Sequence, residues 1–167
     1  MGHHEHEELS RSSIDFSVLT FTDSRNEATD KSGKIIIDML VAAGHRLNSY
    51  SVVREDPDSM RACLEETLGD ARTQAVICNG GTGLSSRDNS IEVVRPMLDK
   101  ELEGFGEIFR LLSFQQIGAA AIMSRATAGI IGKKPIFCLP GSTKAVRLAM
   151  QRIIVPQLAH LVWEARR

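Results

Sequence analysis

The chain has 167 residues, a formal net charge of −1 and 43% hydrophobic residues. These values are ordinary for one soluble globular domain, and a net charge so close to zero gives no global field that would recruit nucleic acid or an anionic membrane. The three cysteines, Cys63, Cys78 and Cys138, lie far apart in the sequence. We therefore expect buried thiols rather than disulfides or a metal site.

The N-terminal segment differs in character from the rest of the chain. Residues 1–13 are polar and lack hydrophobic periodicity, which predicts a disordered tail before a single domain at residues 14–167. The sequence shows no signal-peptide pattern and no apolar run long enough to span a bilayer. We therefore expect a cytoplasmic protein with no membrane partner.

Three strand–helix units in succession open the predicted domain. The expected strands are the apolar runs Phe16–Phe21, Tyr50–Val53 and Ala75–Cys78. A helix capped by Asp30 or Ser32 runs to about Ala43, and a second helix begins near Pro57 and ends at Gly69. Successive βα units predict a parallel sheet with helices on both faces.

The second half of the chain makes the predicted sheet mixed. Helices are expected at Ile91–Leu98, from Gly104 onward, at Gly118–Met123, and from Ser142 with a kink at Pro156. Strands are expected at Ser124–Ile131 and Ile136–Leu139, and the connection between them is short. So short a connection requires an antiparallel pair.

A glycine-rich segment, Asn79–Asp88, lies between the third strand and the following helix. Strand, glycine-rich turn and helix is the layout in which backbone N–H groups cradle an anion. Arg87 could add a charge-assisted bond to phosphate, and Asp88 could hold a magnesium ion. The segment matches neither the Walker nor the GxGxxG pattern, so a plain turn at a strand end is the alternative.

Two further strand ends carry candidate site residues. Asp23, Ser24 and Arg25 follow the first strand, at the edge where parallel sheets bind ligands, although a capped loop would look the same. Pro140–Ala145 follows the last strand and places Lys144 in the first turn of a helix. A lysine there opposes the helix dipole, so it either faces an anion or is simply solvated.

Four segments in order resemble the molybdenum cofactor biosynthesis proteins of the MoaB/MogA type, the molybdopterin-binding domain family. They are Gly80–Leu84 with Arg87 and Asp88, Gly104–Arg110, Ser124–Gly129 and Pro140–Ala145. The resemblance covers the chain from about Phe16 to Leu161. It implies a three-layer α/β/α sandwich with a mostly parallel mixed sheet, and self-association as a trimer or hexamer.

The resemblance also implies a ligand and a reaction. The ligand is molybdopterin, which carries a terminal phosphate and a dithiolene. In active members of the family, Mg²⁺-ATP donates an adenylyl group to that phosphate. ATP and molybdopterin are then substrates, and Mg²⁺ is the required metal ion.

The implied site residues fall into two groups. The expected catalytic residues are Asp88, Glu55 and Asp56, with Asp88 as the magnesium ligand. The expected phosphate- and pterin-binding residues are Asp23, Ser24, Gly80, Gly81, Thr82, Gly83, Arg87, Glu107, Arg125, Pro140, Gly141, Ser142 and Lys144.

One departure from the family pattern bears on activity. Arg54 and Glu55 stand where some active members have Pro-Asp, with Asp56 next. A non-catalytic molybdopterin-binding scaffold is therefore a second hypothesis, and a nucleotide-processing hydrolase that shares the domain is a third. For assembly, the apolar residues Phe105, Phe109, Leu111, Leu112 and Phe114 predict a subunit interface.

Overall fold

The computed structural model describes residues 13–167. Its strands are β1 (Asp15–Phe21), β2 (Arg46–Val53), β3 (Ala75–Asn79), β4 (Lys100–Glu101), β5 (Thr127–Ile131) and β6 (Lys134–Leu139). Its helices are α2 (Lys31–Ala42), α3 (Pro57–Gly69), α4 (Ser90–Val94), η1 (Arg95–Met97), α5 (Glu103–Ile117), η2 (Gly118–Met123), α6 (Thr143–Ala149), η3 (Met150–Ile154) and α7 (Val155–Arg166). The predicted disordered tail, except for Ser13, lies outside the described residues.

All six strands form one mixed sheet in the order β2-β1-β3-β6-β5-β4. The first four of these pair in parallel, whereas β5 is antiparallel to both β6 and β4. The predicted antiparallel β5–β6 pair is confirmed. The two-residue edge strand β4 was not expected, because a lysine and a glutamate in an exposed strand carry no apolar signal.

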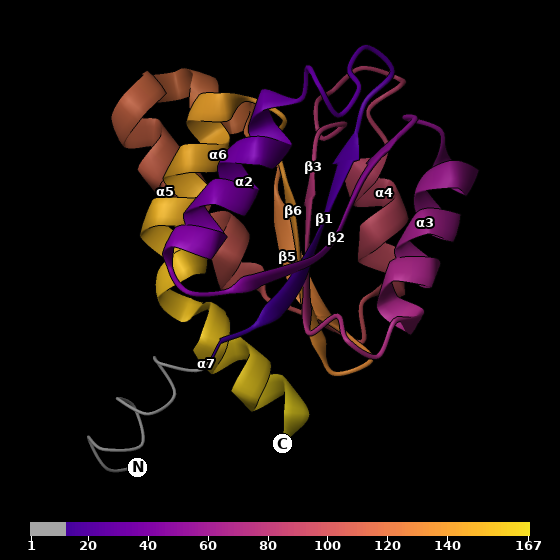
Figure 1. Cartoon of the computed structure of the whole chain (residues 1–167). Coiled ribbons are helices and arrows are strands. Elements are labelled where there is room, and N and C mark those ends of the chain that lie inside the picture. Colours follow the sequence, from indigo (N-terminus) through magenta and orange to yellow (C-terminus); the bar gives the residue numbers. More distant parts are fainter. Residues whose placement is uncertain (1–12) are drawn as a thin grey trace.

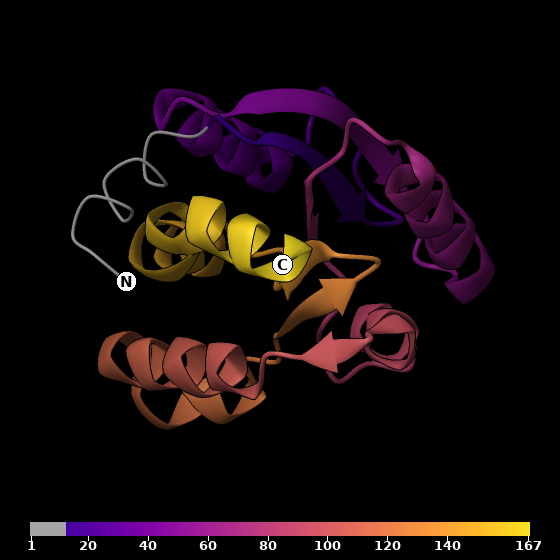
Figure 2. The ribbon, with the colours of Figure 1, turned by 90° about the horizontal axis from the view of Figure 1, so that it is seen from below.

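Helices cover both faces of the sheet, as a three-layer sandwich requires. Figure 1 shows α2, α5, α6 and α7 on one face and α3 and α4 on the other, and Figure 2 shows the same layers end-on. Side chains alternate between the two cores along each buried strand. In β3, Ala75 and Ile77 pack under the first group of helices, whereas Val76 and Cys78 pack under the second.

The cysteines match the sequence-based expectation, whereas the start of the second strand does not. The three cysteines are free thiols, and Cys78 and Cys138 are buried, as predicted. Strand β2 begins at Arg46 rather than Tyr50, because its polar first residues belong to an exposed edge strand and lack an apolar run. Within residues 13–167, no helix has both the length and the apolar character that crossing a membrane would require.

The C-terminal helix changes its winding where a kink was predicted. A π-helical turn, η3, joins α6 to α7 just before Pro156. Proline has no N–H to donate to the carbonyl four residues earlier, and a π turn is one way for a helix to absorb such a defect. Every fourth residue from Val146 to Val162 is buried, namely Val146, Met150, Ile154, Leu158 and Val162, and Leu148 and Ala149 of α6 are buried as well.

The interface prediction for α5 is wrong for two of its residues. Phe105 and Phe109 are 6% and 0% exposed, and the Phe105 ring packs edge-on against Phe137 with centroids 5.4 Å apart. They belong to this chain's own core because residues four apart share one helix face. Leu111 and Phe114 point the other way and are 61% and 59% exposed.

We expect Phe109→Ala to lower the free energy of unfolding by about 3–5 kcal/mol, because it leaves a cavity in a closed core. Urea unfolding followed by circular dichroism measures this. Arg110→Ala, at the next and exposed position of the same helix, is the control and should change stability by less than about 0.5 kcal/mol. Equal losses in the two variants would contradict the assigned core.

Candidate functional site

The candidate site lies at the carboxyl edge of the parallel strands. Strand β1 has β2 on one side and β3 on the other, so the chain reverses its direction of winding between β1 and β3. Ligands of open α/β sheets bind in the crevice that such a reversal leaves at the carboxyl ends. In Figure 1 the loops after β1 and β3 lie together at the top of the molecule.

A cavity of about 490 Å³ opens at this edge. Its floor is the glycine loop after β3 and the loop after β6, and its far wall comes from α5 and η2. The residues that line it are Phe21, Arg25, Glu55, Gly80, Gly81, Thr82, Gly83, Asp88, Ser113, Gln116, Ile117, Met123, Ser124, Pro140, Gly141, Ser142, Lys144, Ala145 and Leu148. This volume suits a small-molecule ligand.

The floor of the cavity is bare backbone held in close contact. Gly80 has a φ of +93°, and a Cβ at this position would overlap the carbonyl oxygen of Phe21. A Cβ on Gly141 would lie 3.1 Å from the Cα of Gly80. Side chains are therefore excluded where the two loops meet, and a ligand can approach the main chain directly.

Hydrogen bonds fix the shape of the glycine loop. The Ser90 hydroxyl donates to the carbonyl of Gly80 at 2.6 Å, and the amide of Ser85 donates to the Asp88 carboxylate at 2.9 Å. The Arg125 guanidinium donates to the carbonyl of Gly83 at 3.0 Å. Asp88 is thus oriented by its own loop and does not cap α4, whose N-cap position is Asn89.

One end of the cavity is acidic. Glu55 and Asp88 both line it, and Asp23 accepts a hydrogen bond from the Glu55 amide at 3.1 Å. Burial raises the pKa of Glu55, and the charges of Asp23 and Asp88 raise it further, against the opposing effect of Arg25 and Arg87. Carboxylates that disfavour one another's ionisation favour binding of a cation.

The carboxylates alone do not make a metal cage. No group of three or more His, Cys, Asp or Glu side chains within residues 13–167 is placed to hold a metal ion. Magnesium commonly takes one or two protein carboxylates, substrate phosphates and water. The pair Glu55 and Asp88 fits that pattern, with the other ligands supplied by a phosphorylated substrate.

The cavity lining also carries two basic side chains, Arg25 and Lys144, and Arg25 is near enough to Glu55 to act on its pKa. Arg25 is held in place by its Nη1 atom, which donates to the Ser32 hydroxyl at 2.9 Å and to the Gly141 carbonyl at 3.5 Å. The same nitrogen lies 3.6 Å from the Asp30 carboxylate. Ser142 is exposed, and its hydroxyl makes no capping bond to the described start of α6.

Asp30, the carboxylate that lies beside Arg25, is fully buried. It accepts hydrogen bonds from the hydroxyls of Thr20 at 2.6 Å, Tyr50 at 2.7 Å and Ser32 at 2.7 Å. Burial by itself raises the pKa of Asp30, but these bonds and one from the Gly33 amide outweigh it, so the pKa lies below its usual value of 3.8. The site thus rests on a buried, ionised carboxylate.

The structure brings most of the predicted site residues into one cavity. Those that line it are Glu55, Gly80, Gly81, Thr82, Gly83, Asp88, Pro140, Gly141, Ser142 and Lys144. Arg25, a candidate from the first strand end, lines it too. Their roles in binding or catalysis stay predictions.

The other predicted residues do not line the cavity. Asp23 and Arg125 support it through Glu55 and Gly83, whereas Asp56 caps α3 by accepting from the Ser59 amide at 2.9 Å. Glu107 lines a separate hollow on α5. Ser24 and Arg87 are exposed neighbours of the site.

Sequence reasoning missed the wall formed by α5 and η2. Ser113, Gln116 and Ile117 of α5, with Met123 and Ser124, line the cavity. Their spacing of three and four residues marks one helix face, which was a usable signal. The apolar residues of α5 predict an interface instead, and that stronger pattern obscures the weaker spacing of the cavity wall.

Comparison with known proteins places this geometry in a family. Residues 13–160 match the family described as a probable molybdopterin binding domain. The chain belongs to the molybdopterin-binding domain family of molybdenum cofactor biosynthesis proteins. The fold predicted from the sequence and the family resemblance are therefore confirmed.

Individual relatives match over nearly their whole length. Molybdenum cofactor biosynthesis protein B of Bacillus subtilis (strain 168) is 46% identical over 168 residues, with 100% of this chain and 99% of the relative covered. A crystal structure of a molybdenum cofactor biosynthesis protein B is 42% identical with a TM-score of 0.92, over 94% of this chain and 98% of that one. The tungsten cofactor synthesizing protein MoaB of Pyrococcus furiosus is 35% identical with a TM-score of 0.84, over 93% and 99%.

We expect Tyr50→Phe to cost about 1–3 kcal/mol of stability at neutral pH, because it removes a hydrogen bond from the ionised Asp30 and retains the ring. The folded-state pKa of Asp30 is depressed, so its stabilising effect is present above the unfolded pKa and is lost as pH falls through the folded pKa. The variant raises that folded pKa and should move the acid-unfolding midpoint to higher pH.

Urea unfolding of both proteins from pH 7 down to pH 3 measures the difference. The gap between wild type and variant should shrink as the pH falls, because protonation of Asp30 removes what the hydroxyl stabilises. A gap of constant size across that range would mean that Tyr50 acts through packing alone.

Proposed function

We propose that this protein binds molybdopterin in the cavity at the carboxyl edge of the sheet and adenylylates the terminal phosphate with Mg²⁺-ATP. The observation that carries the proposal is the composition of one cavity, whose lining combines bare glycine backbone, the carboxylates of Glu55 and Asp88, and the cations Arg25 and Lys144. Family membership supports molybdopterin as the ligand. The relatives named above are molybdenum and tungsten cofactor synthesis proteins.

The reaction requires two phosphates to be brought together in line. An oxygen of the molybdopterin phosphate bonds to the α-phosphorus of ATP, and the bond from that phosphorus to the β-phosphate oxygen breaks with release of pyrophosphate. Both reactants are anions, so positioning and charge neutralisation account for most of the catalysis. Magnesium, when bound with ATP, supplies charge neutralisation and orientation of the phosphates.

The residues of this chain divide that work by position. The amides of the loop from Gly80 to Gly83 can donate to one phosphate, while Arg25 and Lys144 offset negative charge. Glu55 and Asp88 would hold the magnesium ion of the nucleotide. In the wall from α5 and η2, the apolar side chains of Ile117 and Met123 suit the flat pterin ring.

One observation favours a binding role without catalysis. Glu55 occupies the position of an aspartate in some active relatives by the resemblance above, and its side chain is longer than an aspartate's by one methylene group. The carboxylate is therefore displaced from where an aspartate would place it, which changes the geometry offered to a magnesium ion. A molybdopterin-binding scaffold is therefore the second candidate, and formation of adenylylated molybdopterin by the pure protein distinguishes the two.

We expect Asp88→Asn to abolish adenylyl transfer and to retain molybdopterin binding. Asparagine keeps the size of the side chain and an oxygen that can accept from the Ser85 amide, so the loop should keep its shape. It removes the charge that a magnesium ion requires. Product formation from molybdopterin and Mg²⁺-ATP gives the activity, and calorimetry gives the molybdopterin affinity.

Asp38→Asn, on an exposed position of α2, is the matched control and should leave both measurements unchanged. Full activity in Asp88→Asn would overturn the metal role of this carboxylate. Failure of the wild-type protein to form the product, with molybdopterin still bound, would establish the scaffold instead.

The exposed face of α5 and η2 supports self-association as a trimer or hexamer. The large apolar side chains on this face are Ile108, Leu111, Phe114, Ile117, Ile122 and Met123, each at least 50% exposed. Contiguous exposed apolar surface of this kind marks interaction sites. Ile117 and Met123 also line the cavity, so a neighbouring copy on this face would lie beside the ligand.

We expect the wild-type protein to be a trimer or hexamer in light scattering at micromolar concentration, and Phe114→Glu to dissociate it toward the monomer. A buried charge without a partner opposes association. Val41→Glu, at a 51% exposed position of α2, introduces the same charge elsewhere and should leave the assembly intact. A monomeric wild-type protein would contradict the proposed interface.

A further inference from the structure

We propose that a basic groove next to the cavity holds the β- and γ-phosphates of ATP and receives the pyrophosphate that leaves. The basic groove is formed by Lys31 and Lys34 of α2 and by Thr143 and Arg147 of α6. This inference rests on the proposed function, because it gives a binding place to the β- and γ-phosphates of the ATP that the proposed reaction uses.

Shared lining residues link the basic groove to the cavity through one intermediate hollow. A hollow of about 360 Å³ shares Arg25, Gly141 and Ser142 with the cavity. A second hollow of about 370 Å³ shares Lys31 and Thr143 with the first. A chain of phosphates can therefore extend from the cavity along the junction between α2 and α6, which pack against each other.

Three cations along this path, Lys31, Lys34 and Arg147, have no carboxylate partner in the described part of the protein. They are exposed and form no ion pair with any residue in the described part of the chain; Lys34 donates to the neutral carbonyl of Ala28 at 3.1 Å. Among residues 13–167, no carboxylate lines either hollow. The nearest buried acid, Asp30, is already satisfied by hydroxyls and by the cap of α2, so the groove keeps its positive charge.

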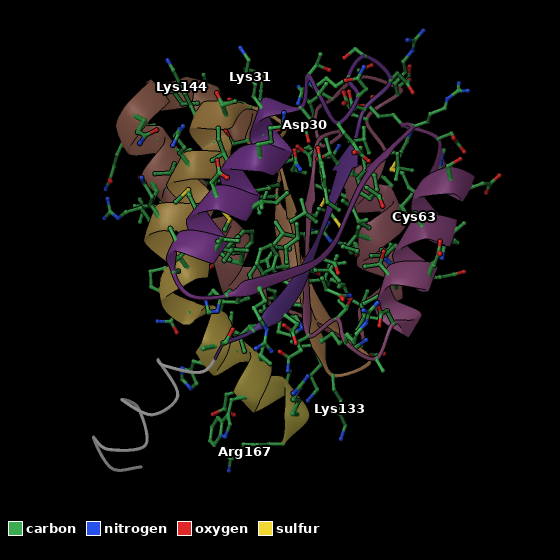
Figure 3. The ribbon with its side chains drawn as sticks, viewed as in Figure 1. Asp30, Lys31, Cys63, Lys133, Lys144 and Arg167 are labelled. Carbon is green, nitrogen blue, oxygen red and sulfur yellow. The ribbon has the colours of Figure 1, made fainter. Side chains whose placement is uncertain are left out.

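The position of the lysines also indicates an anion. Lys31 and Lys144 each stand in the first turn of a helix, where the helix dipole disfavours a cation. Figure 3 shows both at the same end of the molecule, above α2 and α6. The chain as a whole has a net charge of −1, so this concentration of cations is local.

A polyphosphate fits these observations better than an acidic protein partner. The hollows are small, and the first of them shares three lining residues with the cavity where the reacting phosphate would lie. In the transfer, the electron pair of the broken bond passes to the oxygen that leaves with pyrophosphate, opposite the attacking oxygen. Cations placed along the leaving side stabilise the charge that develops there.

The test compares nucleotides that differ only in the phosphates at issue. Calorimetry with ATP, AMP and inorganic tripolyphosphate, all with magnesium, is carried out on the wild type and on the double variant Lys34→Gln/Arg147→Gln. The variant should bind ATP and tripolyphosphate about tenfold more weakly, the loss expected for two exposed ion pairs. AMP binding should be unchanged, because AMP has no β- or γ-phosphate.

Lys133→Gln is the matched control, since Lys133 lies at the opposite end of the molecule. It should leave all three affinities unchanged. An equal loss for ATP and AMP, no loss for either, or tighter binding of polyglutamate than of tripolyphosphate would overturn the proposal.

A parallel assay for adenylylated molybdopterin separates this proposal from the proposed function. An inactive wild type whose affinity for ATP still depends on Lys34 and Arg147 would refute the transfer reaction and support the basic groove. An active wild type whose affinity for ATP ignores both residues would refute the basic groove alone.

Discussion

The close approach of Gly80 to the end of β1 is the constraint on which the site depends. A side chain at Gly80 would overlap the Phe21 carbonyl, and the Gly80 amide donates to the Leu139 carbonyl at 3.0 Å. The ends of β1, β3 and β6 are thereby drawn to one place. Because Gly141 packs on the same glycine, two loops that are far apart in the sequence present their backbone to one cavity.

The charges around that backbone are separated by the fold rather than by sequence distance. Glu55 and Asp88 come from the ends of β2 and β3, whereas Arg25 and Lys144 come from the ends of β1 and β6. The buried Asp30 holds Arg25 in the cavity lining. A substrate that carries both a metal ion and several phosphates can therefore find carboxylates and cations in one cavity.

Local patterns made much of this predictable, and long-range contacts account for what was missed. The apolar runs predicted the buried strands, and the glycine loop was found because its residues are adjacent in sequence. Asp30 or Ser32 was expected to cap α2, and Asp30 does so, but its bonds from Thr20 and Tyr50 join strands that only the fold brings together. Likewise, the sequence does not show that Phe105 and Phe109 pack against the chain's own sheet, because their contact with Phe137 joins distant segments.

The four-residue spacing of buried side chains in the last helix has a consequence for how this segment tolerates change. In an α-helix of 3.6 residues per turn, a spacing of four drifts around the axis by about 40° at each step. The wider turn at Met150–Ile154 takes up part of that drift, so that both Val146 and Val162 reach the core. A π turn holds about one residue more than an α turn, so deleting one residue there would leave a regular helix whose later residues face nearly the same way. Deleting one residue within α7 would instead rotate everything beyond it by about 100°. The segment should therefore tolerate a one-residue deletion in this turn better than one in α7.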